Sequence, residues 1–195
     1  MVLVGSGWHP PLFREECRAL LGPIETLHPR MTFVTQADSV LERISGASLV
    51  DDVIHSTSRL WVYERDVSAV DIATYVDEWA ESFLPAGSFA VRARKLGTGV
   101  CDLSRREIES EVGAKISSDQ RPVDLENPDS EIVVVLAGPG ESSGHWDDAQ
   151  QNPLILWGIR YGSFPGTYVG TSPTDRPFFK PVTMDPRLAR LMVSL

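Results

Sequence analysis

The sequence contains little cysteine and little lysine, and it lacks any long apolar run. Its 2 cysteines, Cys17 and Cys101, lie far apart and form no CxxC pair, which argues against a zinc ribbon or a disulfide scaffold. We expect both thiols to be buried and the protein to reside in the reducing cytoplasm. Because no stretch of about 18 apolar residues is present, we expect neither a membrane-spanning helix nor a membrane partner. The opening MVLVGSGWHPPL has no basic leader, so it predicts a buried strand rather than a secretory signal.

Residue types that commonly build catalytic or metal sites are also sparse. The 4 histidines are scattered, and none of them has the spacing of metal ligands or of a catalytic triad. For the acidic pairs at 51–52 and 147–148, the sequence identifies no further oxygen ligands. The sequence therefore predicts no metal site and no catalytic residue.

Positive charge is scarce overall and unevenly distributed. With 18 Lys and Arg against 27 Asp and Glu, the formal net charge is −9, which disfavours indiscriminate binding to nucleic acid. Residues 1–80 hold 6 cations against 12 acidic residues, whereas residues 161–195 hold 4 against 2. Only 3 of the 18 cations are lysines, and arginine is the better bidentate ligand for phosphate. An acidic net charge is therefore compatible with a local anion-binding surface.

The first half of the chain alternates short apolar runs with helical patterns. This alternation returns to a strand within about 60 residues, which predicts a small α+β sandwich of ferredoxin-like type over residues 1–68. The expected strands are MVLVG, IETL, MTFVTQ and ASLVDDVIHST, and the expected helices are PPLFREECRALLG and ADSVLERISG.

The second half predicts another α/β unit. The run VDIATYVDEWAESF has apolar residues at helical spacing. In FAVRARK, alternation places Phe89, Val91 and Ala93 on one face of a strand and the arginines on the other. A helix is expected to begin after Ser104, which stands three residues before Glu107 as in a capping box. EIVVVLA predicts a strand buried on both faces, and LILWGIRYG predicts a further strand.

Five cations cluster where the FAVRARK strand ends and the next helix begins. Arg92, Arg94 and Lys95 belong to the strand, and Arg105 and Arg106 fall at the first two helical positions. Cations there oppose the helix dipole by about 0.3–1 kcal/mol each, whereas free backbone N–H groups at a helix start favour an anion. The cluster predicts a phosphate-binding corner. The alternative is that these arginines pair with nearby acidic residues on a solvated face.

The order and spacing of these segments resemble the THUMP domain, an RNA-binding module. The resemblance covers 86–137 and rests on FAVRARK, SRREIESEVGAKI and PVDLENPDSEIVVVL. It implies a THUMP domain over 69–165, preceded by the ferredoxin-like domain, that binds the acceptor stem and 3′ CCA end of tRNA. By this resemblance, the residues expected to contact RNA are Arg92, Arg94, Lys95, Arg105, Arg106 and Lys115.

The C-terminal stretch DRPFFKPVTMDPRLARLMVSL resembles the linker and first helix of archaeal tRNA (guanosine-N2) methyltransferases of the position-ten type. In that family the helix precedes a Rossmann-like domain that binds S-adenosylmethionine. The resemblance implies that 166–195 are a linker and the start of a methyltransferase domain missing from this chain. That domain would act in cis or in trans, so we expect this chain alone to bind no cofactor and to transfer no methyl group.

Two other functions stay open. A self-contained enzyme dependent on S-adenosylmethionine would use the glycine-rich loop at 138–144, which follows the strand EIVVVLA. The residues behind that loop show no helical period, and the Asn/Asp-Pro-Pro-Tyr/Phe motif of such methyltransferases is absent, which weakens this alternative. A protein-interaction adaptor would instead use the acidic first domain.

The last residues predict a short amphipathic helix. Asp185 and Pro186 are good starting residues, and Leu188, Leu191 and Met192 recur at helical spacing. Isolated helices shorter than about 12–15 residues are marginal in water. We therefore expect this end of the chain to be frayed or packed on a neighbouring molecule.

Overall fold

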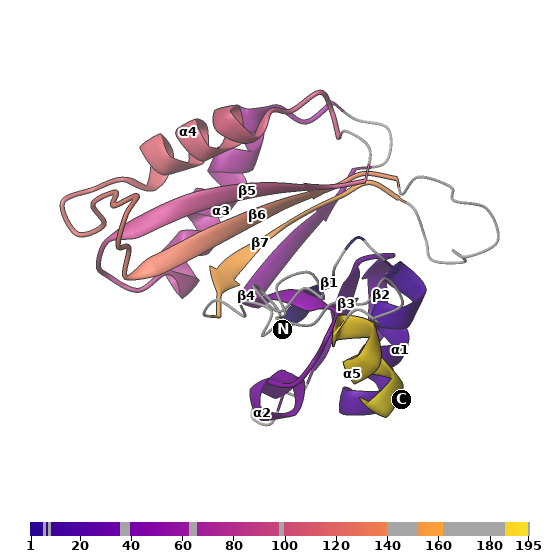
Figure 1. Ribbon diagram of the computed structural model, residues 1–195. Coiled ribbons are helices and arrows are strands. Elements are labelled where there is room, and N and C mark those ends of the chain that lie inside the picture. The colour runs from indigo at the N-terminus through magenta and orange to yellow at the C-terminus, as the bar shows by residue number, and fades with distance from the viewer. Residues whose placement is uncertain are drawn as a thin grey trace, which may run out of the picture. The chain divides into compact units, whose positions relative to one another are not determined.

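The computed structural model describes residues 1–5, 7, 9–35, 40–62, 66–97, 100–139, 152–161 and 186–194, which pack into two compact units (Figure 1). The first unit comprises the described residues up to Val53 together with 186–194. The second comprises the described residues from Ile54 to Tyr161. The units divide inside a strand, so they do not coincide with the domain limits expected at 68 and 165, which stay predictions.

The first unit has the strand order of a ferredoxin-like fold. β3 lies between β2 and β1 and pairs antiparallel with both, and β4 follows β1, which gives the order β2-β3-β1-β4. This βαββαβ arrangement confirms the ferredoxin-like prediction. Its elements are β1 (Val2–Gly5), α1 (Pro10–Leu21), β2 (Glu25–His28), β3 (Met31–Phe33), α2 (Val40–Ile44) and β4 (Val50–Trp61).

The local sequence of helix α1 determines where this helix begins. Two prolines occupy its first positions, where no N–H partner is needed, and Nδ1 of His9 accepts a hydrogen bond from the backbone N–H of Leu12 at 3.3 Å. The HPPL stretch is therefore a helix start. Cys17 of this helix is buried, and burial raises the pKa of its thiol to about 12, so the thiol stays protonated at neutral pH. Cys101 is only half-buried, so the expectation of two buried thiols is wrong for that residue.

The last helix, α5 (Pro186–Ser194), packs in this first unit (Figure 1). Leu191 is 1% exposed and is buried with Phe13 and Cys17 of α1, and Leu188 packs against the same core. Met192 projects outward and is 64% exposed. The expectation that this end is frayed or packed on a neighbouring molecule is wrong for the described residues, because α1 covers the apolar face of the helix.

The second unit is a mixed sheet covered on one face by two helices. Its strand order is β4-β7-β6-β5, in which β7 pairs antiparallel with β4 and β6, and β5 pairs parallel with β6. Helices α3 and α4 cover the same face of β5, β6 and β7 (Figure 1). These elements confirm the α/β fold class. They are α3 (Ala69–Phe83), β5 (Phe89–Leu96), α4 (Arg105–Ile116), β6 (Ser130–Ala137) and β7 (Leu154–Arg160).

The core of the second unit lies between this sheet and the two helices. Strand β6 is fully buried from Ile132 to Ala137, as its continuous apolar run predicts. Trp79 and Trp157 are buried in the same core. In the parts of the chain that the structure describes, no helix combines the length and hydropathy needed to cross a bilayer.

Candidate nucleic-acid interface

Strand β5 lies at the edge of the sheet and directs its cations two ways. Phe89 and Ala93 pack into the core beneath the helices, as the alternation predicts. Arg92 and Arg94 are half-buried, and by the same alternation they lie on the opposite face of the sheet. Lys95 is exposed and returns to the helix-covered face near the start of α4. The cations of FAVRARK therefore do not share one surface.

The start of α4 is fixed by a cap. Oγ of Ser104 accepts a hydrogen bond from the backbone N–H of Glu107 at 3.1 Å, which is one half of the expected capping box. The cap sets where the helix begins and thereby places Arg105 and Arg106 at its first two positions, with both side chains exposed. The first N–H groups of a helix have no partner within the helix, so this end favours an anion.

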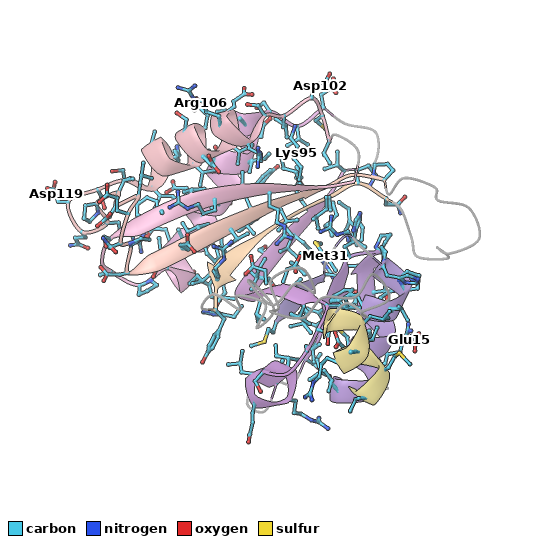
Figure 2. The ribbon with its side chains drawn as sticks, in the orientation of Figure 1. Glu15, Met31, Lys95, Asp102, Arg106 and Asp119 are labelled. Carbon is cyan, nitrogen blue, oxygen red and sulfur yellow. The ribbon has the colours of Figure 1, made fainter. Side chains whose placement is uncertain are left out.

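A hollow of about 680 Å³ lies between the end of β5 and the start of α4, and we call it the cationic hollow. Lys95 lines it from the strand and Arg106 lines it from the first turn of the helix; both residues are labelled in Figure 2. Among the described residues, no acidic side chain forms an ion pair with Lys95, Arg105 or Arg106. The lining residues are Lys95, Ser104, Arg105, Arg106 and Glu109, so three cations face one carboxylate.

Arg92 is held by the protein itself. Its Nε donates to Oε1 of Glu131 at 3.1 Å, and one of its terminal nitrogens donates to the carbonyl of Leu125 at 2.6 Å. Oε2 of Glu131 accepts a hydrogen bond from Arg160 at 2.6 Å, so this carboxylate lies between two arginines. An arginine has five N–H donors, and Arg92 uses two of them to tie the 121–125 segment to the sheet.

Arg94 and Lys115 also lie away from the cationic hollow. Arg94 is on the face of the sheet that α4 does not cover. Lys115 follows Arg106 by nine residues, which is about two and a half helical turns, so the two side chains project from opposite sides of α4. The structure therefore gathers Lys95, Arg105 and Arg106 around the cationic hollow, whereas the other three predicted residues do not line it.

A second hollow of about 340 Å³ adjoins the first, and we call it the apolar hollow. It shares Arg106 and Glu109 with the cationic hollow. Val123 and Leu125 form an exposed apolar wall, at 46% and 61% exposure. The lining residues are Val91, Arg92, Arg106, Glu109, Ser110, Gly113, Ala114, Val123 and Leu125. The sequence reasoning missed this hollow, although two apolar residues inside the polar PVDLENPDS stretch were a signal for it.

The backbone edge of β5 beside these hollows is already hydrogen-bonded. Oε1 of Glu109 accepts from the N–H of Ala93 at 2.8 Å. Nearer the start of the strand, the N–H of Phe89 donates to the carbonyl of Pro122 at 3.0 Å, and the N–H of Asp124 donates to the carbonyl of Phe89 at 2.9 Å. These contacts protect an edge that would otherwise be open to another strand.

The DLENPD stretch builds the turn behind the apolar wall. Oδ1 of Asp124 accepts from the N–H groups of Asn127 and Glu126 at 3.0 and 2.9 Å, and these bonds lower the pKa of its carboxyl. Oδ2 of Asp129 accepts from the hydroxyl and the N–H of Ser88, both at 2.8 Å, which lowers the pKa of Asp129 in the same way. Hydrogen bonds to the ionised form stabilise it. Both aspartates therefore hold the local fold together.

Metal-ligating side chains do not cluster in the described parts of the chain. Among them, no group of three or more His, Cys, Asp or Glu side chains is placed to hold a metal ion. The expected alternative cofactor loop at 138–144 lies outside the described residues from position 140 onward.

Comparisons in sequence relate the chain to known proteins. Residues 68–138 match the THUMP domain family. Over its whole length the chain is 30% identical to the tRNA (guanine(10)-N2)-dimethyltransferase of Methanothermobacter thermautotrophicus, of which it covers 54%. The chain thus spans about half the length of this curated relative.

Two solved structures share the fold. TrmN from Thermus thermophilus has a TM-score of 0.59 at 21% identity, over 99% of this chain and 54% of that one. PH1313 from Pyrococcus horikoshii has a TM-score of 0.51 at 16% identity, over 83% of this chain and 55% of that one. At these identities the likeness concerns the fold alone.

Proposed function

Because the chain contains a THUMP domain, we propose that its second unit binds RNA and that the natural RNA is tRNA. The relative that is 30% identical to this chain is a tRNA methyltransferase, which supports this assignment of the ligand. The finer proposal is that the unit holds the acceptor stem and the 3′ CCA end.

The cationic hollow is the observation on which this proposal rests. Lys95, Arg105 and Arg106 surround one concave site with exposed side chains and without acidic partners among the described residues. The arginine guanidinium groups match phosphate oxygens bidentately, and the lysine adds a compact charge. The start of α4 supplies further N–H donors and a favourable dipole. A phosphate is therefore the group that fits this hollow best.

Contacts of this kind position an RNA without reading its bases. A module that holds the shared acceptor end of many tRNAs needs this property. We propose that the chain holds the tRNA so that a methyltransferase domain, in cis or in trans, reaches a guanosine at a fixed distance. S-adenosylmethionine would bind in that domain, and this chain would contribute positioning only.

Fluorescence anisotropy with labelled tRNA tests the binding proposal. We expect intact tRNA to bind more tightly than the same tRNA without its CCA end. The affinity should fall with salt, with a log–log slope of about 0.7–0.9 for each phosphate neutralised. Equal affinity for both RNAs would remove the CCA part of the proposal, and an affinity independent of salt would remove the cationic hollow as its basis.

A methyl-transfer assay tests the division of labour. Unmodified tRNA and labelled S-adenosylmethionine are incubated with the 195-residue chain, with and without a methyltransferase domain from a relative. We expect label in the RNA only when that domain is present. Label incorporated by the chain alone would show that it has catalytic groups of its own.

A further inference from the structure

We infer that the apolar hollow takes an unpaired base of the RNA whose phosphate occupies the cationic hollow. The inference rests on the proposed function, because it gives one base of the proposed RNA ligand a binding site of its own. The two hollows share Arg106 and Glu109, so a ligand in one is in reach of the other. A nucleotide is a ligand that joins an anion to a flat uncharged ring over such a short span.

Charge distinguishes the two hollows. The cationic hollow has three cations against Glu109. In the apolar hollow, Arg92 is paired with Glu131, so the remaining lining holds one cation, Arg106, and one carboxylate, Glu109, and has no net charge. An anion therefore gains most in the first hollow, and an uncharged group is preferred in the second.

The lining of the apolar hollow suits a base. Its volume of about 340 Å³ falls within the usual range of ligand pockets, about 300–1,000 Å³. The exposed side chains of Val123 and Leu125 offer an apolar surface for the face of a ring. Ser110 and Glu109 offer a hydroxyl and a carboxylate to its polar edge. Single-stranded RNA is commonly held by bases stacked on aromatic rings or arginine guanidinium groups together with phosphate contacts, and in this hollow the aliphatic wall takes the place of the aromatic ring.

A β-strand from a peptide is a poorer occupant. Such a strand would need the outer N–H and C=O groups of β5. The N–H of Ala93 is already bonded to Glu109, and Phe89 is bonded on both its groups to the 122–124 segment. The edge therefore has no continuous run of groups to pair with, while the space above it stays open.

Gly113 allows the hollow to be filled without disturbing the fold. A Cβ atom built at this position meets no atom within 4 Å, and Gly113 lines the hollow. Leucine and alanine are both better helix formers than glycine. Gly113→Leu therefore fills the hollow in a helix that is at least as stable, and Gly113→Ala gives the same helix benefit with little filling.

The test uses two RNA hairpins with the same duplex and the same 3′ tail of phosphates. One tail carries its bases, and in the other the tail nucleotides are abasic. We expect the wild-type chain to bind the first hairpin about tenfold more tightly, near the lower end of the effect of one base stacked on an aromatic ring, because the wall here is aliphatic. Gly113→Leu should lose this difference, Gly113→Ala should keep most of it, and the salt slope should be the same for all three proteins.

The outcomes separate the inference from the proposed function. If Gly113→Leu still distinguishes the two tails, or if the wild type never does, the base is not in the apolar hollow, although RNA binding itself stands. If the wild type binds neither hairpin, or if an Arg105→Gln/Arg106→Gln variant binds both as well as the wild type, the cationic hollow is not an RNA site. In that case the inference is overturned together with the proposed function.

Discussion

The second unit contains two groups of cations that look alike in sequence and differ in their surroundings. Lys95, Arg105 and Arg106 line a hollow and have no acidic partner among the described residues. Arg92 and Arg160, on the other face of the sheet, share the carboxylate of Glu131. The first group has charge to offer to a ligand, whereas the charge of the second group is already used to hold the fold.

This difference shows what a basic stretch in a sequence does and does not establish. FAVRARK supplies one member of each group, Lys95 and Arg92, because alternate residues of a strand face opposite sides. Lys95, on one side, lies near the start of α4, whereas Arg92, on the other side, pairs with Glu131 of β6. The four predictions that follow test this division between open and paired cations.

The largest effect on RNA binding is expected from the open group. Arg105→Gln together with Arg106→Gln removes two charge-assisted contacts, each worth about 1.5–3 kcal/mol. We expect at least a tenfold loss of tRNA affinity and a salt slope reduced by about two contacts. Thermal unfolding should be unchanged or slightly improved, because cations at these positions oppose the helix dipole. Unchanged affinity would place the RNA elsewhere.

The paired group should behave in the opposite way. Glu131→Gln leaves Arg92 and Arg160 without their shared carboxylate, and we expect it to lower the free energy of unfolding by about 1–2 kcal/mol. RNA affinity should fall only modestly, through a looser apolar wall, and the salt slope should not change. Urea unfolding and anisotropy in a salt series measure the two effects. A slope lowered by one unit in Arg92→Gln would show instead that Arg92 contacts phosphate.

A smaller effect, on stability alone, is expected from Asp129. Its pKa is lowered by the hydroxyl and the N–H of Ser88, so its contribution to stability is fully present above the ordinary aspartate pKa of about 4. That contribution is lost as the pH falls through the lowered value. Asp129→Asn should therefore be slightly less stable than the wild type at pH 7, and the two should converge in acid. A difference that stays constant down to pH 2 would point to another cause.

The smallest effect is expected from Lys115, an exposed cation that does not line the cationic hollow. It is exposed on α4 but projects away from Arg106. Lys115→Gln removes the same charge as Arg106→Gln, yet we expect tRNA affinity within about twofold of the wild type. If both variants lose affinity equally, net charge rather than the hollow governs binding.

Short-range sequence patterns predicted much of the fold. The strand β6, the cap at Ser104 and the βα alternation of the first unit all follow from short-range periodicity and capping. The gathering of Lys95 with Arg105 and Arg106 also follows, because their elements are close together in the sequence.

The features that local patterns did not indicate involve contacts between distant residues. The position of Arg92 beside Glu131 depends on the parallel register of β5 and β6, which is set by tertiary packing. The apolar hollow needs the 121–125 segment to return along the edge of β5, which no local pattern states. The packing of Leu191 on α1 joins residues at opposite ends of the sequence.

The burial of Leu191 against α1 affects the order in which the two units fold during synthesis. The first unit cannot complete its core until Leu191 has been synthesised, because this leucine is buried among residues of α1. The described residues of the second unit lie between these two parts of the chain and have a core of their own. Domains generally fold as units during synthesis, so the second unit should reach its native state while the first unit still lacks helix α5.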